Sequence, residues 1–402
     1  MLVYYNKKLS FCQLYDILSQ GLKGGNSMVY LDYSATTPVS DDVLNTFVRV
    51  SKEYVGNSNS LHKLGVDSKR LMDSSSKQVA NLLNVKASEI IFTSSSSEAN
   101  NMAIVGTVLK YMDRGKHIIK TKLEHSSVLE SVNYLQSLGY EISYVDVLNN
   151  GLIDLDDLKR KLRKDTVLVS ISHVNSEVGF CKEIAKIVKI VKSNYQTILH
   201  VDGTQAIGKT KVNLKDIDLY TFSAHKIYGL KGVACLVKKE KILMEPLIHG
   251  GKSQTIYRSG TPAVALYASL SKALRICLEN YDENIKKVEK MYDRLMLGLK
   301  KLPVFINSNE FCVPHIVNIS VLGIKPETLL HEFEKNEIYI STKTACSTSS
   351  SASLAIQAVY NDNARASHSI RISLSHLTTE AEIDFFLEKL EEAITKLCFI
   401  KN

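Results

Sequence analysis

One cysteine near the end of the chain has surroundings unlike those of the others. Cys346 lies in the segment IYISTKTACSTSSSAS, whose Ser, Thr, Ala and Lys residues are typical of an exposed loop. Cys235 and Cys277 lie in apolar runs, where a free cysteine is usually buried and inert. The cysteines show no CxxC or Cys/His spacing, so we expect no metal site. Cys346 is therefore either a reactive thiol or an incidental loop residue.

Lys226 follows an apolar, strand-like run and precedes a glycine-containing turn, in the stretch DLYTFSAHKIYGLKG. In open α/β sheets ligands bind at the carboxyl ends of the strands, so this position favours an active-site lysine. Ser223 and His225 would add a hydroxyl and an imidazole around one anionic ligand. A lysine that forms a Schiff base needs such a partly enclosed setting, whereas a solvated surface lysine does not.

Two further strand ends carry groups that complement this lysine. Asp202 ends the apolar run of TILHVDGTQAIGK, and Gln205 follows it. A carboxylate beside a pyridinium nitrogen keeps it protonated, as the electron sink of pyridoxal phosphate requires, although Asp202 could equally cap a helix. Ser96 and Ser97 follow the run IIFT at a helix start, where N–H groups and hydroxyls suit a phosphate. A Ser-x-x-Glu sequence is also an ordinary capping box.

Alternating strand-like and helical segments would position these groups. The strand-like runs are EIIFT, HIIKT, YEISYVDV, TVLVSIS, TILHVDG and DLYTFS, and helical stretches such as CKEIAKIVKIVKS separate them. This alternation predicts an α/β fold with a mostly parallel central sheet flanked by helices. A long helical pattern from Val264 to about Leu302 leads out of that layer into a smaller α+β unit.

These patterns predict two domains and an extension. Residues 40–285 would form a large cofactor-binding domain, and residues 28–39 together with 286–402 a small domain that carries the loop of Cys346. Residues 1–27 end in the turn-like GLKGGNS, and Met28 directly precedes a better domain start, VYLDYSATTP. We interpret residues 1–27 as an added or dispensable extension.

The composition is that of an ordinary soluble globular protein. Of the 402 residues, 45% are hydrophobic and 23% charged, and 50 Lys+Arg against 42 Asp+Glu give a net charge of +8. The lysines are scattered, which favours a solvated surface over direct nucleic-acid binding, although a basic face could help to meet tRNA or an acidic partner. No run approaches the roughly 18 apolar residues of a membrane span, and the start lacks a signal-peptide core. We expect a cytoplasmic location, where an unpaired thiol survives.

The ordered motifs of the chain resemble those of a known family. They are YLDYSATTP, TSSSSEANN, EHSSV, HVNSEVG, HVDGTQAIGK, FSAHKIYGLKG, HGGKSQTIYRSGT, TACSTSSSAS and SIRISLSHLTTEAEI. From about Met28 to the C-terminus this set is similar to the cysteine desulfurases, fold-type I enzymes of the class V aminotransferase group. The long Ser-rich loop between Cys346 and Arg371 resembles that of the NifS/IscS-like group.

The resemblance implies pyridoxal 5'-phosphate as the cofactor and gives the matching residues their roles. Lys226 matches the Schiff-base lysine, Asp202 the partner of the ring nitrogen, and Gln205 a donor to the phenolic oxygen. His125 matches the imidazole that stacks on the ring, whereas without the motif a structural histidine would be favoured. The residues that match the phosphate cradle are Ser96, Ser97, Ser223 and His225, with Thr261 reaching it from a second subunit. The match of Thr261 implies a homodimer.

Two further residues match the site for the substrate, L-cysteine. Asn175, which also borders the cofactor in the family, and Arg371 match the pair that holds the substrate carboxylate. A guanidinium can grip a carboxylate with two hydrogen bonds. Outside this motif, an arginine in a strand is most often on the surface.

Cys346 matches the mobile loop thiol of the family. The resemblance implies that its thiolate takes sulfur from L-cysteine, that L-alanine leaves, and that the persulfide passes to an acceptor, with Lys226 or His125 moving protons. A free cysteine has a pKa near ~8.5, so a neighbouring positive charge would help to ionise it. Lys343 is either that charge or a solvated loop residue.

Two motifs depart from the common pattern. The usual loop resembles SSGSACTSAS and is commonly followed by Glu-Pro, whereas this chain has STKTACSTSSSAS with Lys343 at the Gly position. TSSSSEANN has serines in place of the Gly, Ala and Thr of TSGATESNN, and Ser97 keeps the hydroxyl. The altered loop leaves two acceptors open, an iron–sulfur scaffold protein or a sulfurtransferase of tRNA thiolation, of which we favour the second.

Other functions compete with this interpretation. Within the enzymes, a selenocysteine lyase or another class V pyridoxal phosphate enzyme is the alternative, and Cys346 argues against a plain aminotransferase. A catalytically silent scaffold is also compatible with the fold, because a fold does not determine function. A silent protein has no physical need for Lys226, Asp202, His125, Cys346 and Arg371 together.

Overall fold

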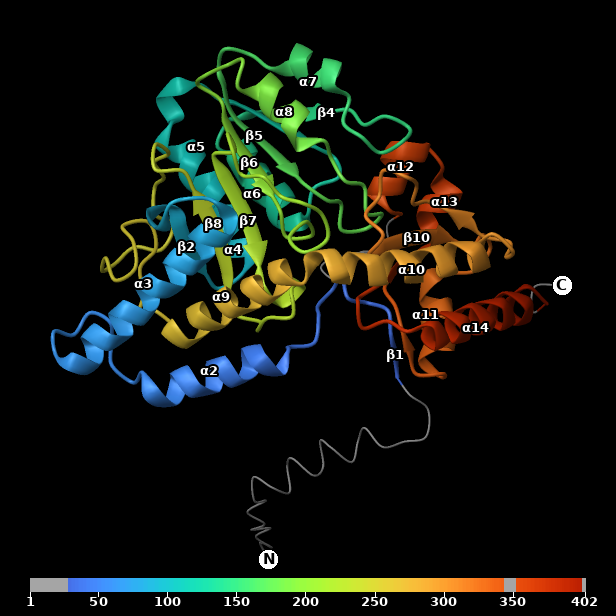
Figure 1. Cartoon of the computed structure of the whole chain (residues 1–402). Coiled ribbons are helices and arrows are strands. Elements are labelled where there is room, and N and C mark those ends of the chain that lie inside the picture. The colour runs from blue at the N-terminus through green and yellow to red at the C-terminus, as the bar shows by residue number, and fades with distance from the viewer. Residues whose placement is uncertain (1–27, 343–351, 400–402) are drawn as a thin grey trace, which may run out of the picture.

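The computed structural model describes residues 28–342 and 352–399 (Figure 1). Lys343, Cys346 and the extension predicted over residues 1–27 lie outside the described residues.

A seven-stranded sheet forms the centre of the larger unit, in the order β2-β8-β7-β6-β5-β3-β4 (Figure 1). Its strands are β2 (Ile90–Thr93), β3 (His117–Thr121), β4 (Glu141–Val145), β5 (Thr166–Ser172), β6 (Ile198–Asp202), β7 (Leu219–Ser223) and β8 (Ala234–Lys238). From β4 to β7 the neighbouring strands are parallel, and β8 is antiparallel to both β7 and β2. The predicted α/β fold with a mostly parallel sheet is confirmed, and every strand-like run named above forms a strand.

Alternate residues of the strands pack on opposite faces of this sheet. In β6, Leu199 and Val201 belong to one hydrophobic cluster and Ile198 to another. In β8, Cys235 packs in the first cluster and Leu236 in the second. Burial of both faces is typical of a parallel sheet, which explains why its strands are continuous apolar runs.

Helices cover both faces. The first cluster includes residues of α2 (Asp41–Glu53), α3 (Lys63–Leu83), α7 (Leu155–Lys161), α8 (Ile184–Val191) and α9 (Val264–Glu279). The second includes residues of α4 (Ser96–Asn101), the π-helical η2 (Met102–Gly106), α5 (Thr107–Lys110) and α6 (Ser126–Ser137). Three short 3₁₀ turns complete the unit: η1 (Ala87–Glu89), η3 (Met112–Arg114) and η4 (Ala224–Lys226).

The long helical pattern that begins at Val264 forms two helices rather than one. α9 ends at Glu279, and α10 (Tyr281–Leu299) follows after Asn280. The Asn280 side chain donates a hydrogen bond of 3.0 Å to the carbonyl of Ile276. Asparagine competes in this way for backbone groups of a helix, which explains the break at this position.

The smaller unit lies at the far end of α10 (Figure 1). Its strands are β9 (Phe305–Ile306), β10 (Ile316–Ser320) and β12 (Ser369–Ser373) in an antiparallel sheet, with β1 (Val29–Tyr30) parallel to β11 (Ile338–Tyr339). Its further helices are α11 (Pro326–Glu334), α12 (Leu354–Tyr360), α13 (Asn363–Ser367) and α14 (Glu380–Phe399). None of the helices in the described part of the chain has both the length and the apolar character of a membrane span.

The start of the described chain packs with its C-terminal part. Val29 and Leu31 share a hydrophobic cluster with Leu295 of α10 and Phe386 of α14. On this packing we propose the domain division predicted above, in which residues 28–39 belong with 286–402.

Candidate active site

A cavity of about 190 Å³ lies where the carboxyl ends of the central strands meet the smaller unit. Asp202 reaches it from the end of β6, Lys226 from the turn after β7, and Arg371 from β12. The predicted site residues that line the cavity are Ser96, Ser97, His125, Asp202, Gln205, His225, Lys226 and Arg371. The fold therefore brings together most of the chemistry that the sequence suggested.

The Lys226 amine contacts backbone carbonyls from the start of the described chain. It donates to the carbonyl oxygen of Ser34 at 2.5 Å and to that of Ala35 at 2.7 Å. Ser34 and Ala35 thus form part of the cavity wall, a role that sequence reasoning did not assign, although the motif YLDYSATTP contains both residues.

Asp202 is buried, and both of its carboxylate oxygens accept hydrogen bonds. The Asn100 amide donates to Oδ2 at 2.9 Å, and the backbone N–H of Thr204 donates to Oδ1 at 3.0 Å. Asn100 is fully buried and was missed by sequence reasoning, although it lies in the motif TSSSSEANN. In the described chain no helix lies between β6 and β7, so the helix-cap interpretation of Asp202 is wrong.

His125 has a defined neutral form. Its Nδ1 accepts the backbone N–H of Ser127 at 3.1 Å, so in the neutral ring the proton lies on Nε2. Burial lowers the pKa of His125 below its usual value, which favours that neutral ring at pH 7.

At the start of α4, the hydroxyl of Ser96 makes no hydrogen bond within the helix. The cap is made by Ser95, whose Oγ accepts the N–H of Glu98 at 3.2 Å, so the capping interpretation is confirmed for this serine. Among the described residues, the buried Oγ of Ser96 has no hydrogen-bond partner. An unpaired buried hydroxyl costs free energy unless a ligand or water satisfies it. His225 is also neutral, because burial and Lys226 lower its pKa to about 4.

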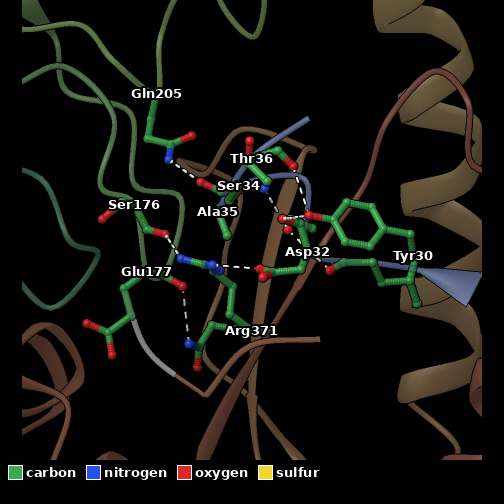
Figure 2. A network of polar contacts seen from close by, with 12 residues as sticks. Tyr30, Asp32, Ser34, Ala35, Thr36, Ser176, Glu177, Gln205 and Arg371 are labelled. Carbon is green, nitrogen blue, oxygen red and sulfur yellow. Dashed lines mark hydrogen bonds and ion pairs between the residues drawn. The ribbon is translucent and has the colours of Figure 1, made fainter. Parts of the chain in front are cut away.

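Arg371 is the largest charged group at the cavity, and its side chain is only 1% exposed. It donates to Asp32 Oδ1 at 2.8 Å and to the carbonyl of Ser176 at 2.9 Å (Figure 2). Its buried Nε has no partner among the described residues. Asp32 and Ser176 hold the guanidinium in place and leave this donor for a further acceptor, and neither residue was anticipated from the sequence.

Three predicted residues do not line the cavity. Asn175 is buried beside it, where its amide donates to the carbonyl of Leu123 at 3.1 Å and its oxygen accepts the N–H of Val178 at 2.8 Å. Ser223 is buried at the end of β7, and Thr261 is exposed. The roles that the resemblance implies for these residues stay predictions.

Cys346 lies outside the described residues, but the chain that leads to it is fixed beside Arg371. The backbone N–H of Arg371 donates to the carbonyl of Ser341 at 2.6 Å, and that of Ser341 donates back at 3.2 Å. Further along the chain, the side chain of Ser353 caps the N-terminus of α12. The backbone N–H of Ser353 donates to the carbonyl of Ala366 at 2.8 Å.

A buried ion pair supports the residue before His125. Lys182 and Glu124 have fully buried side chains, with Nζ and Oε1 3.7 Å apart. Lys182 also donates to the carbonyl of Ser172 at 2.8 Å, and Glu124 accepts the N–H of Ser172 at 2.6 Å. The pair therefore anchors the segment that leads to His125 against the end of β5.

We expect Lys182→Ala to lower the free energy of unfolding by about 3–5 kcal/mol, because it leaves Glu124 buried without its cation. The exposed Lys186, which pairs with Glu183, is the matched control, and Lys186→Ala should cost less than about 1 kcal/mol. Urea denaturation of both variants measures the difference. Equal losses would show that the buried pair has no special weight.

The chain matches a known protein family over most of its length. The family described as aminotransferase class-V matches residues 29–386 of the chain. The chain belongs to this class-V aminotransferase family. Among its curated relatives is cysteine desulfurase IscS of Dictyoglomus turgidum, 37% identical over 377 residues that cover 92% of this chain and 95% of the relative. IscS of Buchnera aphidicola subsp. Baizongia pistaciae is 37% identical over 92% of this chain and 93% of its own.

Solved structures agree with this placement within the class-V family. A NifS-like protein has a TM-score of 0.87 and 35% identity, covering 92% of this chain and 99% of its own. A NifS-like protein from Rickettsia africae has a TM-score of 0.81 and 32% identity, covering 91% and 99%. SspA in complex with cysteine has a TM-score of 0.77 and 26% identity, covering 87% and 99%. The resemblance to the NifS/IscS-like cysteine desulfurases is confirmed.

Proposed function

We propose that the protein is a pyridoxal phosphate-dependent cysteine desulfurase, which removes sulfur from L-cysteine to give L-alanine and a persulfide on Cys346. The observation that carries this proposal is the single cavity that gathers Lys226, Asp202, His125 and Arg371 beside the fixed start of the cysteine loop. Relatives named cysteine desulfurase over most of the chain support it.

The residues of the cavity fit the cofactor. The unpartnered hydroxyl of Ser96, with Ser97 and His225, would hold the phosphate. Asp202 would pair with the ring nitrogen, and the Lys226 amine would hold the cofactor. When bound, pyridoxal phosphate supplies an electron sink that weakens the bond between Cβ and sulfur of the substrate.

Arg371 would bind the carboxylate of L-cysteine and so orient its sulfur toward the loop of Cys346. The Cys346 thiolate attacks that sulfur, and a sulfur–sulfur bond forms as the Cβ–S bond breaks. The electron pair of the broken bond stays with the carbon, which is then protonated and leaves as L-alanine. Lys226 and the neutral His125, with its proton on Nε2, are the groups that would move protons at the cavity.

The purified protein, loaded with pyridoxal phosphate, tests this function. We expect a yellow protein that releases L-alanine and, with a reductant, sulfide in equal amounts from L-cysteine. Colour without turnover of L-cysteine would instead favour another class V reaction, and faster turnover of L-selenocysteine would favour a selenocysteine lyase. A protein that binds no pyridoxal phosphate would favour the interpretation as a catalytically silent scaffold.

Arg371→Met should lower kcat/KM for L-cysteine by about 10- to 100-fold, because a charge-assisted hydrogen bond from the unpartnered Nε to the substrate carboxylate is worth about 1.5–3 kcal/mol. Steady-state kinetics measure this loss, and the visible band of the bound cofactor should persist as evidence that the cavity is intact. An unchanged kcat/KM would remove Arg371 from the substrate site.

We further propose a homodimer, in which the exposed Thr261 reaches the phosphate of the partner's site. The persulfide would pass to a sulfurtransferase of tRNA thiolation or to an iron–sulfur scaffold protein, and we favour the first because the cysteine loop departs from the common pattern. A nucleophilic, unpaired thiol also favours a reducing cytoplasmic compartment. Sedimentation of the purified protein tests the dimer, and transfer of labelled sulfur to each class of acceptor separates the two partners.

A further inference from the structure

Lys209 is a buried lysine that the proposed reaction does not use. Only 7% of it is exposed, and it forms no ion pair with a carboxylate of the described residues. Its amine donates a hydrogen bond to the side-chain oxygen of Gln205. A buried cation without an acid is costly, and an apolar side chain of similar size would often be more stable at such a position. Packing therefore does not explain why a lysine occupies position 209.

The contacts of Gln205 fix which way its amide points. Its Oε1 accepts from Lys209. Its Nε2 donates to the carbonyl of Ser34 at 2.9 Å, as Figure 2 shows. The carbonyl of Ser34 can only accept, so it favours the same orientation as Lys209 does, with the amide nitrogen on the side of the cavity. Burial lowers the pKa of Lys209, but a neutral amine keeps two N–H groups and can still donate to Oε1.

Lys209 lies behind Gln205 and not in the cavity itself. Gln205 lines the cavity of about 190 Å³ with Lys226 and Asp202. Lys209 instead borders a second cavity of about 340 Å³, where Tyr228 and Cys277 are among the lining residues and which shares Lys226 with the first. The hydrogen bond to Gln205 is therefore the contact through which Lys209 can orient a group of the first cavity.

We propose that Lys209 is a positioning residue, which holds the Gln205 amide with its N–H groups toward the bound pyridoxal phosphate. Gln205 then donates to an oxygen of the cofactor instead of presenting its own oxygen to it. Without Lys209 the amide is held only by the Ser34 carbonyl, which also accepts from Lys226, so the amide can turn its own oxygen toward the cofactor oxygen. This inference rests on the proposed function, because it needs pyridoxal phosphate in the cavity.

A double-mutant cycle tests the proposal by cofactor binding. The dissociation constant of pyridoxal phosphate is measured for the full-length wild type, Lys209→Met, Gln205→Leu and the double variant. We expect Lys209→Met to weaken binding about five- to tenfold, the value of one hydrogen bond, in the wild-type background. In the Gln205→Leu background the same change should alter binding less than about twofold, because the amide is already absent.

Two further variants separate positioning from structure. Lys209→Gln keeps an N–H donor, so its affinity should stay within about twofold of the wild type. Lys238, a buried lysine at the opposite end of the sheet, donates to the carbonyl of Ile242 at 2.7 Å. Lys238→Met is the matched control and should leave cofactor affinity unchanged. The ratio of visible to near-ultraviolet absorbance of the bound cofactor should change in Lys209→Met and in neither of these variants.

Equal losses from Lys209→Met in both backgrounds, or no loss in either, would overturn the proposal. If Lys209→Met does not fold, Lys209→Gln decides, since a tenfold weaker affinity in a folded Lys209→Gln protein would also overturn it. A wild type that binds no pyridoxal phosphate would contradict the proposed function instead, so the two failures are distinguishable.

Discussion

Replacement of Lys226 by alanine is expected to remove the visible absorption band of bound pyridoxal phosphate and to lower turnover of L-cysteine by about 10³-fold or more. The amine lies in the cavity with Asp202 and His125, where it donates to the carbonyls of Ser34 and Ala35. It is therefore placed both to hold the cofactor and to move a proton. Absorption spectroscopy and alanine release measure the two losses.

Lys231 provides the control for this variant. It is an exposed lysine that, like Lys226, follows strand β7. Lys231→Ala should keep both the visible band and the turnover within about twofold, as expected for a solvated side chain. A Lys226→Ala protein that stays yellow and active would place the essential amine elsewhere.

Replacement of Cys346 by alanine should abolish sulfide release while the cofactor band remains. The thiolate is the nucleophile that accepts the sulfur, so its loss should lower the rate by about 10³-fold or more. Because the variant keeps Lys226, Asp202 and Ser96, which would hold the cofactor, binding of pyridoxal phosphate should persist. Loss of sulfide release with an unchanged spectrum separates the role of Cys346 from that of Lys226.

Cys312 provides the control for the Cys346→Ala variant. Burial raises the pKa of Cys312 to about 12, so it stays protonated and unreactive at neutral pH. Cys312→Ala should retain the sulfide release of the wild type within about twofold. Similar losses in both cysteine variants would show that Cys346 has no special role.

The sequence was sufficient to predict the strands and the ends at which the site lies. The apolar runs of β5, β6 and β7 are buried on both faces, so their composition alone marks them as central strands. Polar residues that directly follow such runs, as Lys226 follows β7, then lie at one edge of the sheet. This is why Lys226, Asp202 and Ser96 could be chosen from the strand ends, whereas His125 was chosen only from the family resemblance.

The other wall of the cavity was not predictable from such runs. Ser34 and Asp32 come from a short segment near the start of the described chain, and they meet Lys226 and Arg371 across long stretches of sequence. Only tertiary packing brings them together, and their side chains follow no period that marks a site. Asn280 was missed for a different reason, because an asparagine within a helical pattern can either continue the helix or break it.

Mass spectrometry of the cysteine loop tests the central claim most directly. The protein loaded with pyridoxal phosphate is treated with L-cysteine without a reductant, and the peptide that contains Cys346 is then analysed. We predict that this peptide gains the mass of one sulfur atom as L-alanine appears, and that Lys226→Ala gains none. Formation of L-alanine with an unmodified Cys346, or with the sulfur on another cysteine, would contradict the account.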